Sequence, residues 1–206
     1  MDFFICISIA YLIGSIPSAV WIGKWLYRID VRDYGSGNAG ATNTFRVLGK
    51  KAGIPVLCID AAKGFFAVYC INGFNTLSQY YPYIQILAGM AALLGHIFPI
   101  FAQFRGGKGV ATLLGVVLAL QPVPCLCSIL VFLIVLLIGR MVSLASIIAG
   151  VTYPIILHVG FHNNNPALSL FSCSVAILLV FTHRKNIKRI LRREEHKIQR
   201  FNFRKG

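Results

Sequence analysis

Residues 35–46, GSGNAGATNTFR, have the residue types in this chain that are best suited to bind an anion. Glycines permit the positive-φ turns that point successive backbone N–H groups into one concavity. Side-chain donors in this segment come from Ser36, Asn38, Thr42 and Asn43. Arg46 adds a planar guanidinium that suits a phosphate. A glycine-rich run is also typical of a flexible loop or a helix cap, but the polar side chains and the final arginine favour ligand binding.

A second cluster, FRGGKGVAT at residues 104–112, repeats this pattern directly before an apolar stretch. Its cations and glycines are Arg105, Gly106, Gly107, Lys108 and Gly109. The N-terminus of a helix attracts phosphate, so we expect a second anion site here. The P-loop pattern GxxxxGK[ST] is not met, because Ala102 occupies the first glycine position and Gly109 follows the lysine. Hydrolysis of ATP is therefore disfavoured.

Two shorter polar segments supply further candidates. Residues 139–146, GRMVSLAS, contain Arg140, Ser143 and Ser146, and the segment after residue 182 begins with His183, Arg184, Asn186 and Arg189. We expect a helix to continue through this second segment, so that His183 and Asn186 share one face, with Ser143 nearby. These side chains suit hydroxyls and phosphate oxygens.

Charged residues also occur inside apolar stretches. Asp60 and Lys63 are three residues apart, so they share a helix face and can form an ion pair. An ionisable residue inside a bilayer is costly and is often functional. The pair either shapes a binding site or is purely structural. His96, near the end of the next apolar stretch, is either a packing residue or a substrate contact.

The elements that must position these residues are membrane helices. The chain has 206 residues, of which 57% are hydrophobic and 13% charged, with a mean hydropathy of +0.73. It is too apolar for an ordinary soluble domain. A bilayer core of about 30 Å needs roughly 20 apolar residues per helix. The apolar stretches are 3–23, 54–72, 83–101, 110–121, 123–139, 144–161 and 167–182. We therefore predict an all-α integral membrane protein with seven transmembrane helices in a single domain, residues 1–206.

Residues 110–139 form a nearly unbroken apolar run that could be one long tilted helix. We predict two helices instead, because Pro122 and Pro124 interrupt the run and Gln121 is polar. A single crossing would also place Arg140 on the wrong side of the membrane. The first of the two helices is short, so we expect it to be tilted, partly re-entrant or extended by the preceding loop.

The distribution of basic residues sets the topology. Nineteen of the 20 Lys and Arg residues lie in residues 24–53, 102–109, 140 and 183–206. The turns near 73–82, 121–124 and 160–166 contain none. By the positive-inside rule the four basic segments are cytoplasmic, which places the N-terminus outside and the basic tail, about 183–206, in the cytoplasm.

The net charge of +14 therefore indicates loops beside a membrane rather than a nucleic-acid-binding surface. We expect the tail to be attracted to anionic lipid headgroups. The six cysteines lie in or at the ends of apolar segments, where a thiol behaves as a small hydrophobe. Cys125 and Cys127 have no second pair of ligands nearby, so we expect neither a disulfide framework nor a metal site.

Five segments together resemble the motif set of the PlsY family, the bacterial membrane glycerol-3-phosphate acyltransferases. They are GSIPSA (14–19), DVRDYGSGNAGATNTFRVLG (30–49), GHIFPIFAQFRGGKGVAT (95–112), GRMVSLAS (139–146) and HRKNIKRIL (183–191). The resemblance spans nearly the whole chain and agrees with seven crossings and an external N-terminus. The sequence departs from the family pattern at Ala39, often proline, at Arg105, commonly lysine, and at Arg193, usually glycine.

The resemblance implies the reaction: transfer of a fatty acyl group from acyl phosphate to glycerol 3-phosphate. The products are 1-acylglycerol 3-phosphate (lysophosphatidic acid) and phosphate, in the first acylation step of phospholipid synthesis. It implies a location in the bacterial cytoplasmic (inner) membrane, with the active site facing the cytoplasm. No cofactor or metal is expected, and the partners are the two substrates and membrane lipid, with no nucleic acid. Oligomeric state and acyl-chain length preference are left open.

By motif position, the resemblance also implies roles for individual residues. We expect the ligands of glycerol 3-phosphate to be Arg46, Lys108, Ser143, His183 and Asn186. We expect the acyl-phosphate head to lie against Ser36, Asn38 and the loop containing Gly106, Gly107 and Gly109. Asn43 joins the substrate-binding set, and Ser36, Asn38, Lys108 and His183 form the catalytic set. Asp60, Lys63 and His96 are expected to shape the site.

The mechanism expected from these residues needs no protein nucleophile, because acyl phosphate is a mixed anhydride with an activated carbonyl. The sequence has no GxSxG motif and no His-x4-Asp motif, since Phe101 and Lys188 stand five residues after His96 and His183. We expect direct attack by the substrate hydroxyl, driven by positioning and charge neutralisation. The departing phosphate can accept the proton, and His183 is the alternative base.

Two other functions fit parts of the sequence. A transporter of phosphorylated metabolites would explain the cationic face and the intramembrane pair, but the outer side has no matching polar gate and no inverted repeat is evident. A membrane scaffold would explain the basic tail alone.

Overall fold

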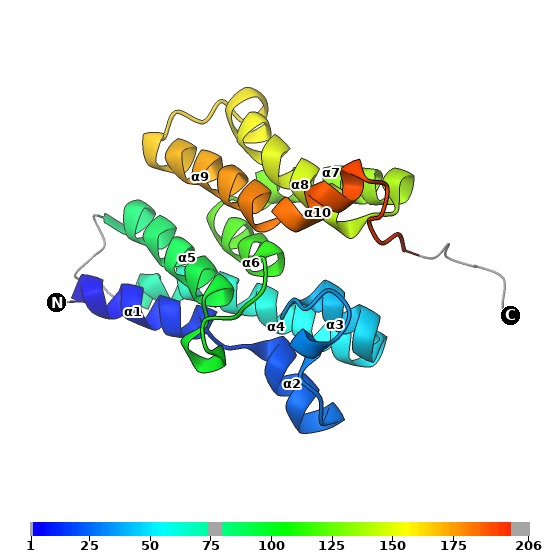
Figure 1. Ribbon diagram of the computed structural model, residues 1–206. Coiled ribbons are helices and arrows are strands. Elements are labelled where there is room, and N and C mark those ends of the chain that lie inside the picture. The colour runs from blue at the N-terminus through cyan, green and yellow to red at the C-terminus, as the bar shows by residue number, and fades with distance from the viewer. Residues whose placement is uncertain (1, 74–79, 199–206) are drawn as a thin grey trace, which may run out of the picture. The chain divides into compact units, whose positions relative to one another are not determined.

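The structure, a computed structural model, describes residues 2–73 and 80–198, and every regular element in those ranges is helical (Figure 1). The chain forms two compact units, residues 1–125 and 126–206. The single domain expected from the sequence stays a prediction. Residues 74–79 of an expected outer turn and residues 199–206 of the expected basic tail lie outside the described ranges.

The first unit is built mainly from six α-helices. They are α1 (Asp2–Gly14), α2 (Ser18–Tyr27), α3 (Ala41–Leu48), α4 (Lys50–Tyr69), α5 (Tyr81–Ile97) and α6 (Val110–Leu120). Short 3-10 helices cover Val31–Asp33, Cys70–Gly73 and Ile100–Ala102. Helix α4 packs against α3, α5 and α6, and α1 packs along α5.

Small residues allow these helices to approach closely. A Cβ atom at Gly14 of α1 would collide with the backbone of Ala92 in α5, and one at Gly64 of α4 would collide with the carbonyl of Thr112 in α6. Gly115 of α6 faces α4 in the same way. Close contact through small residues is typical of helix packing in membranes, where apolar burial between helices gives little driving force.

The second unit contains the remaining helices. Helix α7 (Pro122–Gly139) begins just before the boundary between the units, and α8 (Val142–Ile155) continues as a π-helix over Ile156–Gly160. Helix α9 (Pro166–Thr182) packs against α8, and the short α10 (Arg184–Leu191) contacts both.

Four helical segments are long and apolar enough to cross a membrane alone: Lys50–Tyr69, Pro82–Ala102, Pro122–Gly139 and Val142–Gly160. Two bent pairs, α1 with α2 and α9 with α10, raise the number to six if each pair is one span. Helix α6 has 11 residues and, at about 1.5 Å per residue, is roughly 16 Å long. Each of the seven expected stretches therefore contains a helix, but seven crossings and the expected orientation of the termini stay predictions.

The structure confirms the break at Gln121, since α6 ends at Leu120 and α7 begins at Pro122. It corrects three other expectations. Residues 3–23 are not one helix, because the chain bends by 41° between α1 and α2. Residues 35–46 are not all loop, because α3 begins at Ala41 with Gly40 as its N-cap. The helix does not run straight on past residue 182, because α9 and α10 meet at 61°.

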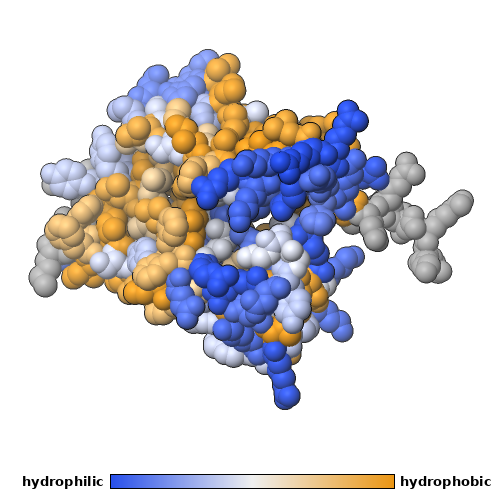
Figure 2. All heavy atoms as spheres, in the orientation of Figure 1, coloured by the Kyte–Doolittle hydropathy of each residue, from blue (hydrophilic) through white to orange (hydrophobic). Residues whose placement is uncertain are grey.

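The surface of each unit agrees with a membrane environment. Hydrophilic residues gather over α2 and α3 in the first unit and over α10 in the second, whereas hydrophobic residues cover much of the other helices (Figure 2). Leu137 and Ile138, near the end of α7, are 74% and 81% exposed. Apolar side chains with this much exposure on long apolar helices are suited to contact lipid.

Candidate functional site

The first glycine loop is organised by Asn43, whose side chain is buried in the first turn of α3. Asn43 Oδ1 accepts hydrogen bonds from the backbone N–H of Ser36 at 2.8 Å and from Ser36 Oγ at 3.1 Å. Asn43 Nδ2 donates to the carbonyls of Val31, at 2.8 Å, and Tyr34, at 3.1 Å. Asn43 therefore holds both ends of the loop, which is the role that the structure gives to this expected substrate-binding residue.

The loop also requires glycine at two positions. Gly35 and Gly37 have φ angles of +62° and +69°, a region that residues with a Cβ rarely adopt. The loop leaves Ser36 and Asn38 partly exposed, and Arg46 is exposed on α3. Ser36, Asn38 and Arg46 are thus accessible, whereas Asn43 is buried.

The second glycine loop packs against the end of α5. The N–H groups of Gly106 and Gly107 donate to the carbonyls of Ile97 and His96, each at 3.1 Å. A Cβ at Gly107 would strike the His96 ring. These two glycines are therefore required for close packing, and their N–H groups are already used.

Donors for an anion at this loop must come from the residues that follow. Helix α6 begins at Val110, directly after Gly109, which has a φ of +85°. The first N–H groups of a helix have no partner within that helix. Lys108 is partly buried and immediately precedes this helix start. Anion binding at residues 104–112 stays a prediction, for which Lys108 and the first turn of α6 are better candidates than Gly106 and Gly107.

The predicted pair between Asp60 and Lys63 is confirmed, with Lys63 Nζ 2.9 Å from Asp60 Oδ1. Ser18 Oγ donates to the same oxygen at 2.7 Å, and His96 Nδ1 lies 3.5 Å from it. Lys63 Nζ also donates to the carbonyl of Ile16 at 2.9 Å. Ile16 lies in the break between α1 and α2, and its carbonyl accepts from Lys63 as well as from the N–H of Ser18.

This buried cluster connects α4 to the α1–α2 break and to α5. Asp60, Lys63 and His96 are each at most 5% exposed. Buried charges are tolerated when they are paired and hydrogen-bonded, and here the pairing is made through Asp60 Oδ1, with Asp60 Oδ2 left without a hydrogen bond from the described residues. Because His96 also contacts the second glycine loop, the cluster lies directly beside one of the candidate anion sites. A role in shaping the site stays a prediction for these three residues.

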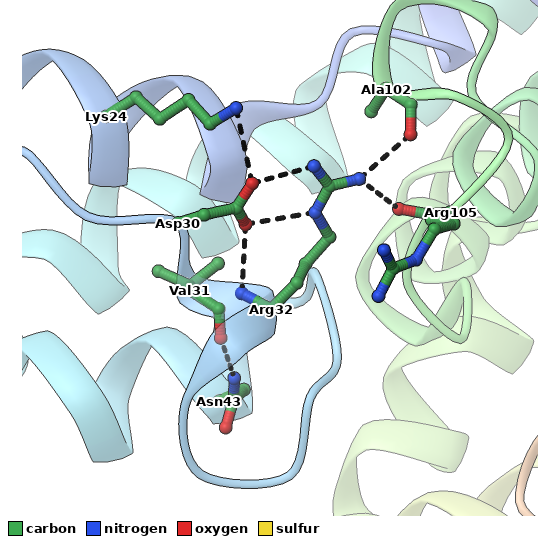
Figure 3. A network of polar contacts seen from close by, with 7 residues as sticks. All are labelled: Lys24, Asp30, Val31, Arg32, Asn43, Ala102 and Arg105. Atoms are coloured by element: carbon green, nitrogen blue, oxygen red, sulfur yellow. Dashed lines mark hydrogen bonds and ion pairs between the residues drawn. The ribbon is translucent and has the colours of Figure 1, made fainter.

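Asp30 and Arg32 form a second network that the sequence analysis did not identify (Figure 3). Arg32 Nε and Nη2 donate to the two oxygens of Asp30 at 2.9 and 2.7 Å, and Lys24 Nζ lies 3.3 Å from Asp30 Oδ2. The hydrogen bond from Arg32 holds the pKa of Asp30 well below its usual range, and the same bond raises the pKa of Arg32. The pair is therefore ionised at any physiological pH.

In the second unit, Glu195 brings two expected ligands together. Its Oε1 accepts from Ser143 Oγ at 2.8 Å and from Asn186 Nδ2 at 2.7 Å, and its Oε2 accepts from Arg189 Nε at 2.8 Å. Burial alone would raise the pKa of Glu195, but the hydrogen bonds from Arg189, Asn186 and Ser143 outweigh it and lower the pKa. The expected proximity of Ser143 to Asn186 is confirmed.

His183 is buried at the bend between α9 and α10. Its Nδ1 lies 2.9 Å from the carbonyl of Leu179 and 3.4 Å from Thr182 Oγ1. A carbonyl can only accept, so this contact assigns the proton of a neutral ring to Nδ1 and leaves Nε2 unprotonated. In this tautomer, Nε2 has the lone pair that a general base needs.

The expected site residues thus fall into two groups, one in each unit. Those in the first unit are Ser36, Asn38, Asn43, Arg46, Asp60, Lys63, His96, Gly106, Gly107, Lys108 and Gly109. Those in the second are Ser143, His183 and Asn186. Within residues 2–73 and 80–198 the six cysteines are free thiols, and His, Cys, Asp and Glu side chains form no group of three that could hold a metal ion.

Sequence reasoning missed Asp30, Arg32 and Glu195. Asp30 and Arg32 stood inside a quoted motif, but their spacing of two residues gives no sign that the arginine reaches a segment 70 residues away. Glu195 lies after the last quoted motif, and its contact with Ser143 depends on the bend after α9.

Comparison with known proteins shows the family. A family model described as glycerol-3-phosphate acyltransferase matches residues 4–193. The glycerol-3-phosphate acyltransferase of Fusobacterium nucleatum is 45% identical over 199 residues, covering 97% of this chain and 100% of that protein. The same-named protein of Chlorobaculum tepidum is 39% identical, covering 96% of this chain and 97% of that protein.

Solved structures agree with this match. The fold resembles a crystal structure of PlsY, an integral membrane glycerol 3-phosphate acyltransferase, in its glycerol 3-phosphate form. The TM-score is 0.88 and the identity 38%, over 97% of this chain and 96% of that one. The lysophosphatidic acid form of PlsY matches with a TM-score of 0.84, 36% identity and the same coverage. The chain belongs to the glycerol-3-phosphate acyltransferase family.

Proposed function

We propose that this protein transfers a fatty acyl group from acyl phosphate to glycerol 3-phosphate and releases lysophosphatidic acid and phosphate. The observation that supports this most strongly is the resemblance to PlsY over 97% of the chain, since PlsY structures are known in a glycerol 3-phosphate form and a lysophosphatidic acid form. These are the acceptor and the product of one acylation. The chain acts within a bacterial inner membrane, with its basic segments facing the cytoplasm.

Acyl phosphate is the proposed donor because the two glycine loops combine hydrogen-bond donors and a cation that suit a phosphate group. The loop at residues 35–40 offers Ser36 and Asn38, and the loop before α6 offers Lys108 beside a helix N-terminus. The P-loop pattern is not met. Phosphate groups on both substrates would then be held by charge-assisted hydrogen bonds.

The cations proposed to bind the acceptor, Arg46 and Lys108, belong to the first unit. Arg46 and Lys108 neutralise the phosphate of glycerol 3-phosphate. Ser143 and Asn186 are already held by Glu195, so their remaining hydrogen-bonding capacity is oriented before substrate binds. Groups that are fixed in advance lose less entropy when they bind, which favours catalysis by positioning.

The chemical step is a direct transfer. The hydroxyl oxygen of glycerol 3-phosphate attacks the carbonyl carbon of acyl phosphate, the bond from that carbon to the phosphate oxygen breaks, and the departing phosphate takes the hydroxyl proton. No protein side chain becomes acylated. His183 binds the acceptor through its polar ring, with Nε2 as the alternative proton acceptor.

The donor is tested by incubating purified protein in detergent with radiolabelled glycerol 3-phosphate and, in separate reactions, acyl phosphate, acyl-CoA or acyl carrier protein. We expect labelled lysophosphatidic acid with acyl phosphate, and at most trace product with the other donors. Turnover with acyl-CoA that equals or exceeds turnover with acyl phosphate would contradict the proposal. Product formation in detergent also excludes a transporter, which requires a sealed vesicle.

A further inference from the structure

Arg32 connects the two glycine loops of the first unit although it belongs to neither (Figure 3). Its Nε and Nη2 are bound to Asp30, and its Nη1 donates to the carbonyl of Ala102 at 2.9 Å and lies 3.4 Å from the carbonyl of Arg105. Its side chain is only 9% exposed. With its charge matched by Asp30 and all three nitrogens in use, Arg32 is poorly suited to bind a substrate phosphate.

The two carbonyls that Arg32 contacts flank a strained turn. Gln103 and Phe104, which lie between them, have φ angles of 56° and 57°. A left-handed conformation is unfavourable for residues with a Cβ and persists only where the surroundings hold it. Arg32 holds both sides of this turn, and the chain passes from it directly into the loop that ends at Lys108 and α6.

On its other side, Arg32 is fixed to the first glycine loop. The preceding residue, Val31, is fully buried and its carbonyl accepts a hydrogen bond from Asn43 Nδ2 at 2.8 Å. The same amide group holds Ser36 through its oxygen. A continuous series of hydrogen bonds therefore runs from Ser36 through Asn43 and residues 31–32 to the carbonyls of Ala102 and Arg105.

We propose that Arg32, held by Asp30, is a positioning residue that fixes Lys108 relative to the first glycine loop without touching either substrate. This inference rests on the proposed function, because it assigns Lys108 and Ser36 to phosphate groups. The bidentate pair fixes the plane of the guanidinium, so a change at Arg32 displaces the second loop rather than removing a ligand.

The test is the Arg32→Lys substitution, which keeps the positive charge but replaces the planar fork with a single ammonium group. A misplacement of about 1 Å can reduce turnover by about a hundredfold. We expect kcat with acyl phosphate to fall about 10- to 100-fold, with a smaller change in KM for glycerol 3-phosphate. Arg28→Lys is the matched control, since Arg28 is exposed in the same segment, and it should keep normal kinetics.

A double-mutant cycle separates positioning from a general structural effect. If Arg32 acts through the loop that carries Lys108, Arg32→Lys should reduce activity little further when Lys108 is already alanine. Independent effects that multiply in the double variant would overturn the inference, as would normal kcat in Arg32→Lys. If the Arg32→Lys protein does not fold, Asp30→Asn weakens the same Asp30–Arg32 pair and replaces Arg32→Lys in the cycle.

The inference and the proposed function fail in different ways. A wild-type protein that forms no lysophosphatidic acid from acyl phosphate defeats the proposed function. If the wild-type protein is active but the double-mutant cycle shows no coupling between residues 32 and 108, only the role of Arg32 is contradicted.

Discussion

At the scale of single residues, His183 is the side chain whose role decides the mechanism. Its Nδ1 contact with the carbonyl of Leu179 leaves Nε2 as the basic nitrogen of a neutral ring. With this geometry, His183 can either bind the substrate hydroxyl or act as a general base. The proposed mechanism favours binding, because the phosphate released from acyl phosphate can itself take the proton.

Substituting His183 by glutamine distinguishes the two roles. Glutamine keeps a polar group but cannot act as a base near neutral pH, so we expect a higher KM for glycerol 3-phosphate, a limited loss of kcat and an unchanged shape of the pH profile of kcat. Steady-state kinetics from pH 5 to 9 measure this. If His183 is the general base, the substitution should instead lower kcat by about 10² to 10⁴, and the acidic limb of the pH profile should disappear. His158→Gln, in the π-helix that follows α8, is the matched control and should keep normal kinetics.

At the scale of elements, the bend between α9 and α10 turns the tail back so that Glu195 reaches Ser143 of α8 and Asn186 of α10. The carboxylate is nearly buried, and three donors surround it. Its lowered pKa means that the ionised form stabilises the fold. This contribution is present above the usual pKa of about 4.5 and is lost as the pH falls through the lower pKa of the folded protein.

Glu195→Gln should therefore destabilise the second unit at neutral pH. Loss of hydrogen bonds to a charged group costs about 1.5–3 kcal/mol, which corresponds to a fall in Tm of roughly 3–12 °C for a chain of this size. Thermal unfolding in detergent measures the effect. The difference between wild type and variant should shrink as the pH falls from 4.5, the usual pKa, through the lower pKa of the folded protein, where the wild-type carboxylate takes up a proton. Glu194→Gln, at the exposed neighbouring position, should unfold like the wild type, and an equal loss there would contradict the assignment.

Local sequence patterns predicted where the helices lie better than they predicted the bends between helices. Pro122 after a polar Gln121 predicted the break between α6 and α7, and the spacing of three residues predicted the pair of Asp60 with Lys63. Pro17 likewise indicates an interruption of the helix, but the surrounding apolar residues suggested one continuous helix. The contact of His96 with Asp60 joins separate helices, so no local pattern could reveal it.

The glycine loops show the same limit of prediction from sequence. The sequence correctly located polar, glycine-rich segments beside apolar helices, but it could not tell which glycines serve packing. Gly106 and Gly107 use their N–H groups on the carbonyls of α5. Asn43 uses its whole amide group inside its own loop. Such assignments depend on which backbone groups meet in three dimensions, which composition does not encode.

At the scale of the whole molecule, the expected ligands occur in both compact units, and the apolar surface of each unit suits a bilayer. In the proposed reaction, these cationic and polar groups bind two phosphate-bearing substrates, and lipid surrounds the acyl chain and the product. The proposed donor, acyl phosphate, supplies an activated carbonyl. The protein is proposed to contribute positioning and charge neutralisation, with no covalent intermediate.

The most direct test of this account is a rapid-mixing measurement of phosphate release from acyl phosphate, with and without glycerol 3-phosphate. Direct transfer predicts no burst of phosphate without the acceptor, and one phosphate released per lysophosphatidic acid formed when the acceptor is present. An acyl-enzyme would release phosphate before the acceptor binds. A burst equal to the amount of enzyme, in the absence of glycerol 3-phosphate, would contradict the account.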